Sequence, residues 1–144
     1  MKEQIPVVVN QTFLQPIDVV WDAITDLSQM QQWFFENIKE FSPVLGFETS
    51  FMVKTPNHDF LHLWKIIEVI PNKKIVYDWS YPDFEGNSLV IWELTEMSNV
   101  TTLTLTCTGI ETYPQGIQEF TRSSCEGGWK YFIQKNLVEY LKNL

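Results

Sequence analysis

Between residues 46 and 110, apolar and polar residues alternate along the chain, and this pattern constrains the fold more than any other feature. Trp92 and Leu94, for example, alternate with Glu93 and Thr95. Successive side chains of a strand point to opposite faces of a sheet, so a period of two predicts strands with one buried face. Turn-forming residues separate the runs at Pro56-Asn57, Pro71-Asn72-Lys73, Pro82 to Asn87, and Ser98-Asn99. Five strands joined by short turns predict an antiparallel meander.

Segments with other patterns precede this region. Residues 5–13 are rich in β-branched side chains and predict one further strand. Pro16 can open a helix because it has no N–H to leave unpaired, and apolar residues then recur at helical spacing from Ile17 to Ile24. A short second helix is predicted over residues 28–34, with Ser28 as its N-cap.

The last segment returns to a helical period. Its apolar stripe consists of Trp129, Phe132, Ile133, Asn136, Leu137, Tyr140 and Leu141, which share one wide face of a helix. A sheet with one apolar face needs a second layer to cover it, and we expect this helix to supply it. The sequence therefore predicts an α+β fold of order β-α-α-β-β-β-β-β-α, in one domain over residues 1–144.

The composition narrows the class of function. Of the 144 residues, 44% are hydrophobic and 15% aromatic, which is enough for a packed core and excludes an intrinsically disordered chain. The formal net charge of -8 argues against binding to nucleic acid, because contact with phosphates requires a basic face. It argues against docking on an anionic lipid surface for the same reason.

The apolar runs are all too short for a membrane-spanning helix, and Val7–Val9 is too short for the core of a signal peptide. We therefore expect a cytoplasmic protein. Cys107 and Cys125 are the two cysteines of the sequence. In a reducing compartment such a pair is expected as two free thiols.

Several motifs spread over nearly the whole chain resemble one superfamily. They are Pro16 to Asp26, Trp33, Ile66 to Pro71, Ile75 to Trp79, Thr101 to Gly109, and Gly128-Trp129 at the start of the last helix. Their order is similar to the START-like, birch-pollen-allergen-like (SRPBCC) superfamily, and within it to the branch named after the activator of the heat-shock protein 90 ATPase. The resemblance implies a helix-grip fold, in which a curved antiparallel sheet wraps around a long C-terminal helix and often leaves a cavity between them.

The resemblance also implies a range of functions, because other branches bind hydrophobic ligands or catalyse polyketide cyclisation. One departure from the family pattern concerns Cys107. Many relatives have histidine at this position, so any role of that histidine is not available to this chain.

The aromatic residues of the inner face are the candidate ligand-binding residues. The predicted cavity lining is Trp33, Phe51, His62, Trp64, Tyr77, Trp79, Trp92, Leu105, Cys107, Trp129, Phe132 and Asn136. Tyr77, His62, Asn136 and the tryptophan nitrogens are the polar groups that would orient a ligand there. Side chains in this pattern also fill ordinary cores, and the sequence leaves both interpretations open.

Two further segments allow two interpretations each. Trp33-Phe34-Phe35 places three aromatic residues near a helix end. Because one helix face can bury at most two of them, the segment is either a packed corner or a gate over a pocket mouth. Tyr113 to Gly116 is a loop before the last helix, and such a loop can serve as a lid.

Metal binding and nucleophilic catalysis are not expected. His58 and His62 are the two histidines of the sequence, and on one strand they would lie roughly 13 Å apart, too far to chelate one ion. The sequence contains neither a Gly-x-Ser-x-Gly nor a Gly-x-Gly-x-x-Gly motif. We therefore predict no catalytic residue, no metal and no cofactor.

Three functions follow from this reasoning. The leading one is binding of a small hydrophobic or amphipathic molecule between the sheet and the last helix. An alternative is a cyclase- or hydrolase-type enzyme in the same cavity, with His62 as the main titratable group and Tyr77 as the second. The third is a co-chaperone-like interaction module, which requires an exposed apolar patch of several hundred Å².

Overall fold

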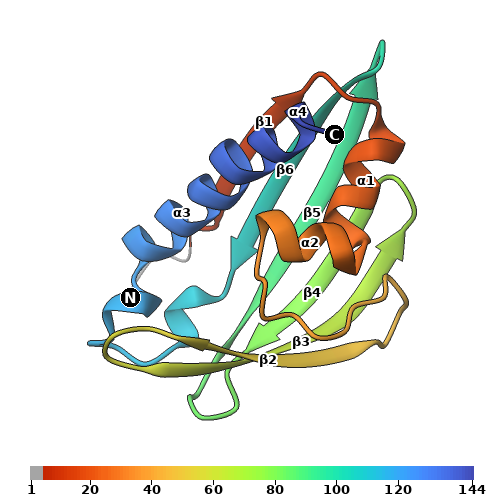
Figure 1. Ribbon diagram of the computed structural model, residues 1–144. Coiled ribbons are helices and arrows are strands. Elements are labelled where there is room, and N and C mark those ends of the chain that lie inside the picture. Colours follow the sequence, from red (N-terminus) through yellow and green to blue (C-terminus); the bar gives the residue numbers. More distant parts are fainter. Residues whose placement is uncertain (1–4) are drawn as a thin grey trace.

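A six-stranded antiparallel sheet forms the body of the protein (Figure 1). The computed structural model describes residues 5–144. The strands are β1 (Val7–Phe13), β2 (Glu48–Lys54), β3 (Asp59–Ile70), β4 (Lys74–Ser80), β5 (Asn87–Met97) and β6 (Val100–Thr108). Their spatial order is β1-β6-β5-β4-β3-β2. The predicted five-strand meander, β2 to β6, is therefore confirmed. The first strand, β1, pairs with β6, the last strand of the meander.

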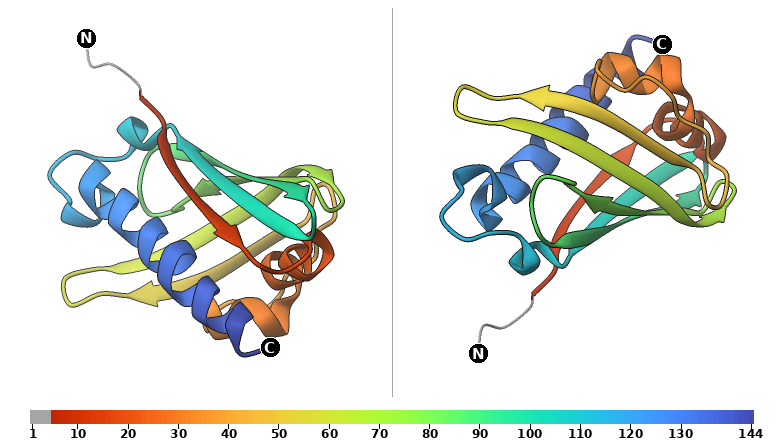
Figure 2. Two further views of the ribbon diagram at one scale, coloured as in Figure 1. Left: turned by 90° about the horizontal axis from the view of Figure 1, so that it is seen from above. Right: turned by 90° about the horizontal axis from the view of Figure 1, so that it is seen from below.

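A long C-terminal helix lies across the concave face of this sheet (Figure 2). It consists of α3 (Arg122–Lys130), the π-helical segment η3 (Tyr131–Leu137) and α4 (Val138–Lys142). The 3₁₀ turns η1 (Ile110–Thr112) and η2 (Gln118–Phe120) connect β6 to it. The helices α1 (Ile17–Thr25) and α2 (Leu27–Trp33) lie between β1 and β2 in the chain. The predicted α+β class and element order are confirmed.

Two predicted element starts differ from the structure. The first strand begins at Val7 rather than at residue 5. The second helix begins at Leu27, and its N-cap is Asp26 rather than Ser28. The Ser28 hydroxyl donates a hydrogen bond of 2.6 Å to the carboxylate of the N-cap residue Asp26, so the serine holds the N-cap side chain instead of being the cap.

Alternation along the strands decides which side chains reach the helix. Trp64 pairs with Trp79 across β3 and β4, and Ile66 pairs with Tyr77. All four side chains are buried, as the period of two predicts. The register shifts between Ile66 and Glu68, and such a bulge increases the local bend of a sheet.

The C-terminal helix buries every fourth residue: Trp129, Ile133, Leu137 and Leu141. In a regular α-helix a stripe with this spacing rotates by roughly 40° per step. The wider π-helical turn of η3 reverses part of that rotation and keeps the stripe on the sheet. Phe132, Asn136 and Tyr140, which the sequence places in the same stripe, are half-buried at its edge.

Candidate functional site

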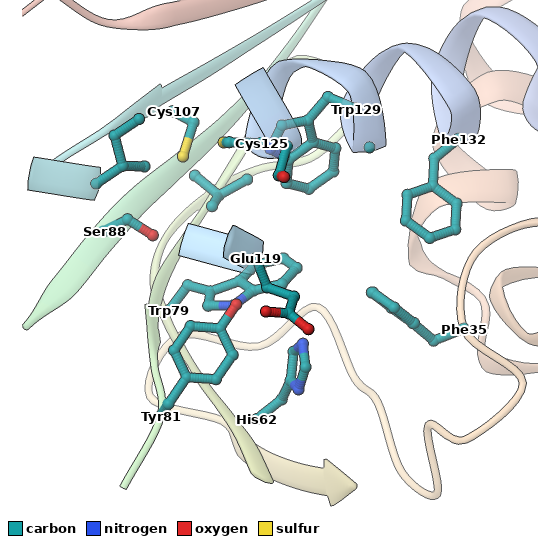
Figure 3. Close-up of a pocket in the computed structure, with 14 residues that line it drawn as sticks. Phe35, His62, Trp79, Tyr81, Ser88, Cys107, Glu119, Cys125, Trp129 and Phe132 are labelled. Atoms are coloured by element: carbon teal, nitrogen blue, oxygen red, sulfur yellow. The ribbon is translucent and has the colours of Figure 1, made fainter. Parts of the chain in front are cut away.

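A pocket of about 190 Å³ lies between the inner face of the sheet and the first part of the C-terminal helix (Figure 3). Strands β3 to β6 form its floor, and α3 and η3 form its roof. Phe35, which follows α2, closes one side, and Glu119 of η2 lies at the other. The pocket is thus built from segments that are distant in the sequence.

The predicted lining residues divide into three groups. Those that border the pocket are His62, Trp79, Cys107, Trp129 and Phe132. Those that lie in the solid core are Trp33, Phe51, Trp64, Tyr77, Trp92 and Leu105, each at most 2% exposed. Asn136 is half-buried and donates a hydrogen bond of 3.2 Å to the backbone carbonyl of Trp33; it borders a separate surface hollow near the C-terminus.

Other lining residues were not among the predicted ones. They are Phe35, Tyr81, Ser88, Val90, Ile110, Glu119, Ser124, Cys125 and Gly128. The periodicity of the sequence could have indicated some of these residues. Ser88 and Val90 continue the inward row of Trp92 on β5, and Cys125 precedes Trp129 by one helical turn. Tyr81 continues the inward row of Tyr77 and Trp79 one residue beyond β4. Glu119 lies in a 3₁₀ turn, and no sequence pattern points to it.

Five of the fourteen residues that line the pocket are aromatic: Phe35, Trp79, Tyr81, Trp129 and Phe132. The rings of Trp79 and Trp129 meet edge to face with centroids 5.5 Å apart. Those of Phe35 and Phe132 are 4.9 Å apart. The indole N–H of Trp79 donates a hydrogen bond of 2.9 Å to the Tyr81 hydroxyl, which fixes the orientation of both rings.

The three consecutive aromatic residues lie at a corner where α2 ends. Trp33 is the last residue of α2, and Phe34 leaves the helical conformation with φ -105° and ψ -108°. The Phe34 ring enters the core and stacks on Trp33 at 5.0 Å and on Trp64 at 5.5 Å. Because the helix ends there, the next residue, Phe35, turns toward the pocket (Figure 3). Two of the rings therefore fill the core and the third lines the pocket.

His62 is a buried titratable group of the pocket wall, 6% exposed. Its ring stacks on Phe51 at 4.8 Å, and its Nδ1 atom lies 3.0 Å from the backbone carbonyl of Phe60. Burial lowers the pKa of His62 to about 4. The ring is therefore neutral at pH 7. Since a carbonyl accepts only, Nδ1 carries the proton, and Nε2 is left as a hydrogen-bond acceptor.

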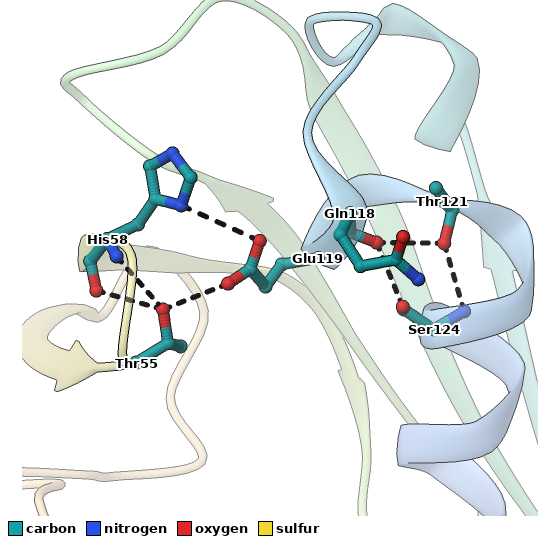
Figure 4. A network of polar contacts seen from close by, with 6 residues as sticks. All are labelled: Thr55, His58, Gln118, Glu119, Thr121 and Ser124. Carbon is teal, nitrogen blue, oxygen red and sulfur yellow. Dashed lines mark hydrogen bonds and ion pairs between the residues drawn. The ribbon is translucent and has the colours of Figure 1, made fainter.

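A polar network joins the turn between β2 and β3 to η2 beside the pocket (Figure 4). The Thr55 hydroxyl donates to the Glu119 carboxylate at 2.9 Å, and His58 Nδ1 lies 3.6 Å from the other carboxylate oxygen. The hydrogen bond from Thr55 is the main cause that lowers the pKa of Glu119. Glu119 is therefore a carboxylate at neutral pH, and it places negative charge at the rim of the pocket.

The predicted lid segment is attached to the sheet through its first residue. The Tyr113 hydroxyl donates 2.7 Å to the backbone carbonyl of Trp79. It also lies 2.8 Å from the Ser88 hydroxyl, which must donate because the tyrosine proton is already used. Tyr113 is 6% exposed and its ring stacks on Phe120 at 5.0 Å. This anchors the segment from β6 to α3 over one end of the pocket.

The two cysteines are free thiols, and both border the pocket. Cys107 is on β6 and Cys125 on α3. In the part of the chain that the structure describes, no group of three or more His, Cys, Asp or Glu side chains is arranged to hold a metal ion.

Comparison with known proteins identifies the family. The family model described as "Activator of Hsp90 ATPase homolog 1-like protein" matches residues 15–142, which is almost the entire chain. The chain belongs to this AHSA1-like family. A search of the curated proteins gives no significant match.

Solved structures show the same fold as this AHSA1-like chain. DynU16, described as a protein in the dynemicin biosynthetic locus, is 25% identical with a TM-score of 0.72. The match covers 95% of this chain and 47% of DynU16, so the chain spans about half the length of that protein. Protein CV1439 from Chromobacterium violaceum is 18% identical with a TM-score of 0.75, over 93% of this chain and 94% of that one. Protein MLL2253 from Mesorhizobium loti is 23% identical with a TM-score of 0.74, over 96% and 98%.

Within residues 5–144, no helix is both long and apolar enough to cross a membrane. Met1 to Gln4, which are part of the predicted domain of residues 1–144, lie outside the described residues.

Proposed function

We propose that the protein binds a small uncharged molecule, about the size of one aromatic ring, in the pocket between the sheet and α3. The observation that carries this proposal is the composition of the wall. Five aromatic and two aliphatic side chains contribute to it, and among residues 5–144 no lysine or arginine lines it. Small-molecule sites are typically apolar clefts with a few polar groups that fix the orientation of the ligand.

The volume limits the size of the ligand. The pocket measures about 190 Å³. An apolar cavity of about 150 Å³ can hold benzene, whereas pockets for drug-sized molecules span about 300–1,000 Å³. A single ring with small substituents therefore suits this pocket, and a long lipid chain does not.

The polar groups of the wall favour a ligand with one hydroxyl-like group. Nε2 of the neutral His62 ring can accept a hydrogen bond, and the hydroxyl of Tyr81, which accepts from Trp79, retains its own proton to donate. The rings of His62 and Tyr81 are 4.8 Å apart, so one group on a ligand can reach both. The carboxylate of Glu119 at the rim and the net charge of -8 disfavour anions.

The same features support binding over acid–base catalysis. A general acid or base is most effective when its pKa lies near the working pH. Because burial lowers the pKa of His62 to about 4, the ring is uncharged at pH 7, so it does not act as an imidazolium acid and is a weak base. The interaction role that the family name suggests finds no specific support in residues 5–144. A cytoplasmic location is part of the proposal, in keeping with cysteines held as free thiols.

Two adjacent glycines of α3 allow a matched test. Gly128 lines the pocket and Gly127 is exposed, and a Cβ at either position meets no atom within 4 Å. Leucine also favours a helix by most of the roughly 1 kcal/mol that glycine costs. We therefore expect Gly128→Leu and Gly127→Leu to fold, with the introduced leucine side chain filling the pocket in the first variant.

The probe is 4-methylphenol, with 4-methylbenzoate as an anion of similar size, each titrated against the ¹⁵N-labelled full chain by NMR. We expect saturable shifts at Trp79, His62 and Trp129 with the phenol, and none with the benzoate. Gly127→Leu retains the binding and Gly128→Leu loses at least tenfold in affinity. Absence of saturable binding to the wild type, or equal affinity in Gly128→Leu, would contradict the proposal.

Native mass spectrometry of the freshly purified protein identifies a natural ligand directly. A discrete mass excess that disappears on denaturation is the expected result for a ligand that copurifies. If that excess exceeds the mass of a molecule with one or two rings, the size argument is wrong.

A further inference from the structure

The two cysteines of the sequence meet at one wall of the pocket. Cys107 projects from β6 and is 3% exposed, whereas Cys125 projects from α3 and is half-buried. Both side chains line the pocket, and Figure 3 shows the two sulfur atoms facing one another. The sheet and the helix therefore contribute one thiol each to a pair with no third cysteine in the chain.

The surroundings of the two sulfur atoms are unequal. Cys125 is the fourth residue of α3, close to the positive end of the helix dipole. The neighbouring Cys107 thiol is the largest cause that lowers the pKa of Cys125. The Trp129 indole and the positive charge of Arg122 add to it, whereas burial and the charge of Glu126 oppose it. The neighbouring Cys125 thiol, together with burial, raises the pKa of Cys107. Cys125 is thus the thiol of the pair that ionises more readily, and Cys107 the thiol that retains its proton.

We propose that Cys107 and Cys125 form a redox-active dithiol, which a hydroperoxide converts reversibly into a disulfide that links β6 to α3. The proposal does not depend on ligand binding, because it requires only the two thiols and access to Cys125. That access runs through the pocket, since Cys125 lines it. Disulfides of reducing compartments are usually transient and serve catalysis or redox sensing.

The reaction has two steps. The Cys125 thiolate attacks one peroxide oxygen, so that an S–O bond forms, the O–O bond breaks, and the alcohol or water leaves with a proton from solvent. Cys107 then attacks the Cys125 sulfur, so that the S–S bond forms and the S–O bond breaks. The oxygen leaves as water with the thiol proton of Cys107. In total, two thiols and one hydroperoxide give a disulfide, an alcohol or water, and one further water molecule.

The disulfide would act on the part of the fold that builds the pocket. It would attach the first turns of the C-terminal helix covalently to the sheet, and it would close the chain between residues 107 and 125. That closed segment contains Tyr113 and Glu119, which anchor the connection over the pocket. We therefore expect oxidation to raise the midpoint of thermal unfolding and to change the affinity of the pocket for 4-methylphenol.

Intact-mass spectrometry tests the proposal on the folded full chain. The protein is treated with hydrogen peroxide, denatured and alkylated with iodoacetamide. The expected product is a monomer that has lost about 2 Da and takes up no alkyl group, and dithiothreitol restores two alkylatable thiols. Peptide mapping should give a Cys107–Cys125 cross-link. The same oxidation in urea should be at least tenfold slower, because the denatured chain does not hold the thiols together.

Serine variants separate the two roles. In Cys107→Ser we expect a sulfenic acid at Cys125, trapped by dimedone, with no loss of 2 Da. In Cys125→Ser we expect Cys107 to resist peroxide in the folded state. Cys107→Ala replaces the first variant if the serine is not tolerated in the core. The proposal is overturned if both wild-type thiols remain alkylatable after peroxide treatment, or if the product is an intermolecular dimer or a sulfinic acid. It is also overturned if the folded protein forms the disulfide no faster than the protein in urea.

Discussion

The carboxylate of Glu119 accepts a hydrogen bond of 2.9 Å from the hydroxyl of Thr55, across 64 residues of sequence. This contact attaches the turn between β2 and β3 to η2, immediately before the helix that covers the pocket. Glu119 itself borders the pocket. One hydrogen bond therefore couples the edge of the sheet to the rim of the candidate site.

Glu119→Gln tests this contact through its pH dependence. The pKa of Glu119 is below its usual 4.5 in the folded state, chiefly through the bond from Thr55. A depressed carboxyl pKa stabilises the folded state above the unfolded pKa, and this stabilisation is lost as the pH falls through the folded pKa. Urea midpoints should therefore be lower for Glu119→Gln than for wild type at pH 7, and the difference should shrink as the pH falls below 4.5. Glu85→Gln, on an exposed residue, controls for the change in net charge.

His62 should make the free energy of unfolding depend on pH in a higher pH range than Glu119 does. Burial lowers its pKa from 6.5 to about 4, so between these values the unfolded chain binds a proton that the folded chain does not. The free energy of unfolding should therefore fall by up to about 3 kcal/mol as the pH decreases from 6.5 to 4. The fall in the free energy of unfolding between pH 6.5 and 4 should be absent in His62→Gln and present in His58→Gln. An imidazole titration by NMR with a midpoint near 6.5 for His62 would contradict the prediction.

Tyr77→Phe should be neutral or stabilising by up to about 1 kcal/mol. The Tyr77 side chain is fully buried, and among residues 5–144 its hydroxyl has no hydrogen-bond partner. Burial of a hydroxyl without a hydrogen-bond partner is unfavourable, so removal of the Tyr77 hydroxyl breaks no hydrogen bond and should not reduce the free energy of unfolding. Chemical denaturation measures the difference.

Tyr113→Phe is the matched control for that variant. Tyr113 is also a buried tyrosine, but its hydroxyl bonds the Trp79 carbonyl and the Ser88 hydroxyl. We expect a loss of about 1–3 kcal/mol, since two buried partners are left unpaired. Equal effects of the two substitutions would show that the assignment of partners is wrong.

Gly86→Ala should be strongly destabilising. Gly86 has a φ of +93°, and a Cβ there would overlap the backbone carbonyl of Thr112 in η1. Gly116 has a similar φ of +84°, but a Cβ there meets no atom within 4 Å. Gly116→Ala should therefore cost only the conformational strain, about 1–2 kcal/mol, and Gly86→Ala clearly more. Thermal unfolding of the two variants side by side distinguishes strain from overlap.

The direction of each strand side chain follows from the sequence alone. Trp64, Tyr77, Trp79 and Trp92 all face the helix, as the period of two predicts, because alternation is a local property of an extended chain. The buried stripe of the last helix follows in the same way from its helical spacing, although the π-helical turn that keeps this stripe on the sheet does not.

Which inward side chains border empty space was decided by tertiary packing. Trp92 and Cys107 both face inward, yet only Cys107 borders the pocket. The reason is Phe34, whose ring occupies the space beside Trp92 at 5.7 Å and Trp129 at 5.8 Å. That ring is there because α2 ends at Trp33. A local break in one helix thus determines how much of the gap between sheet and helix is filled.

The sequence therefore determined the fold and the set of side chains that face inward, since both depend on periodicity within single elements. The tertiary structure decided the position and size of the pocket, the contact between Cys107 and Cys125, and the bond from Thr55 to Glu119. Each of these depends on the distance between layers and on loops without a regular period. Such distances arise only when all the side chains are packed together.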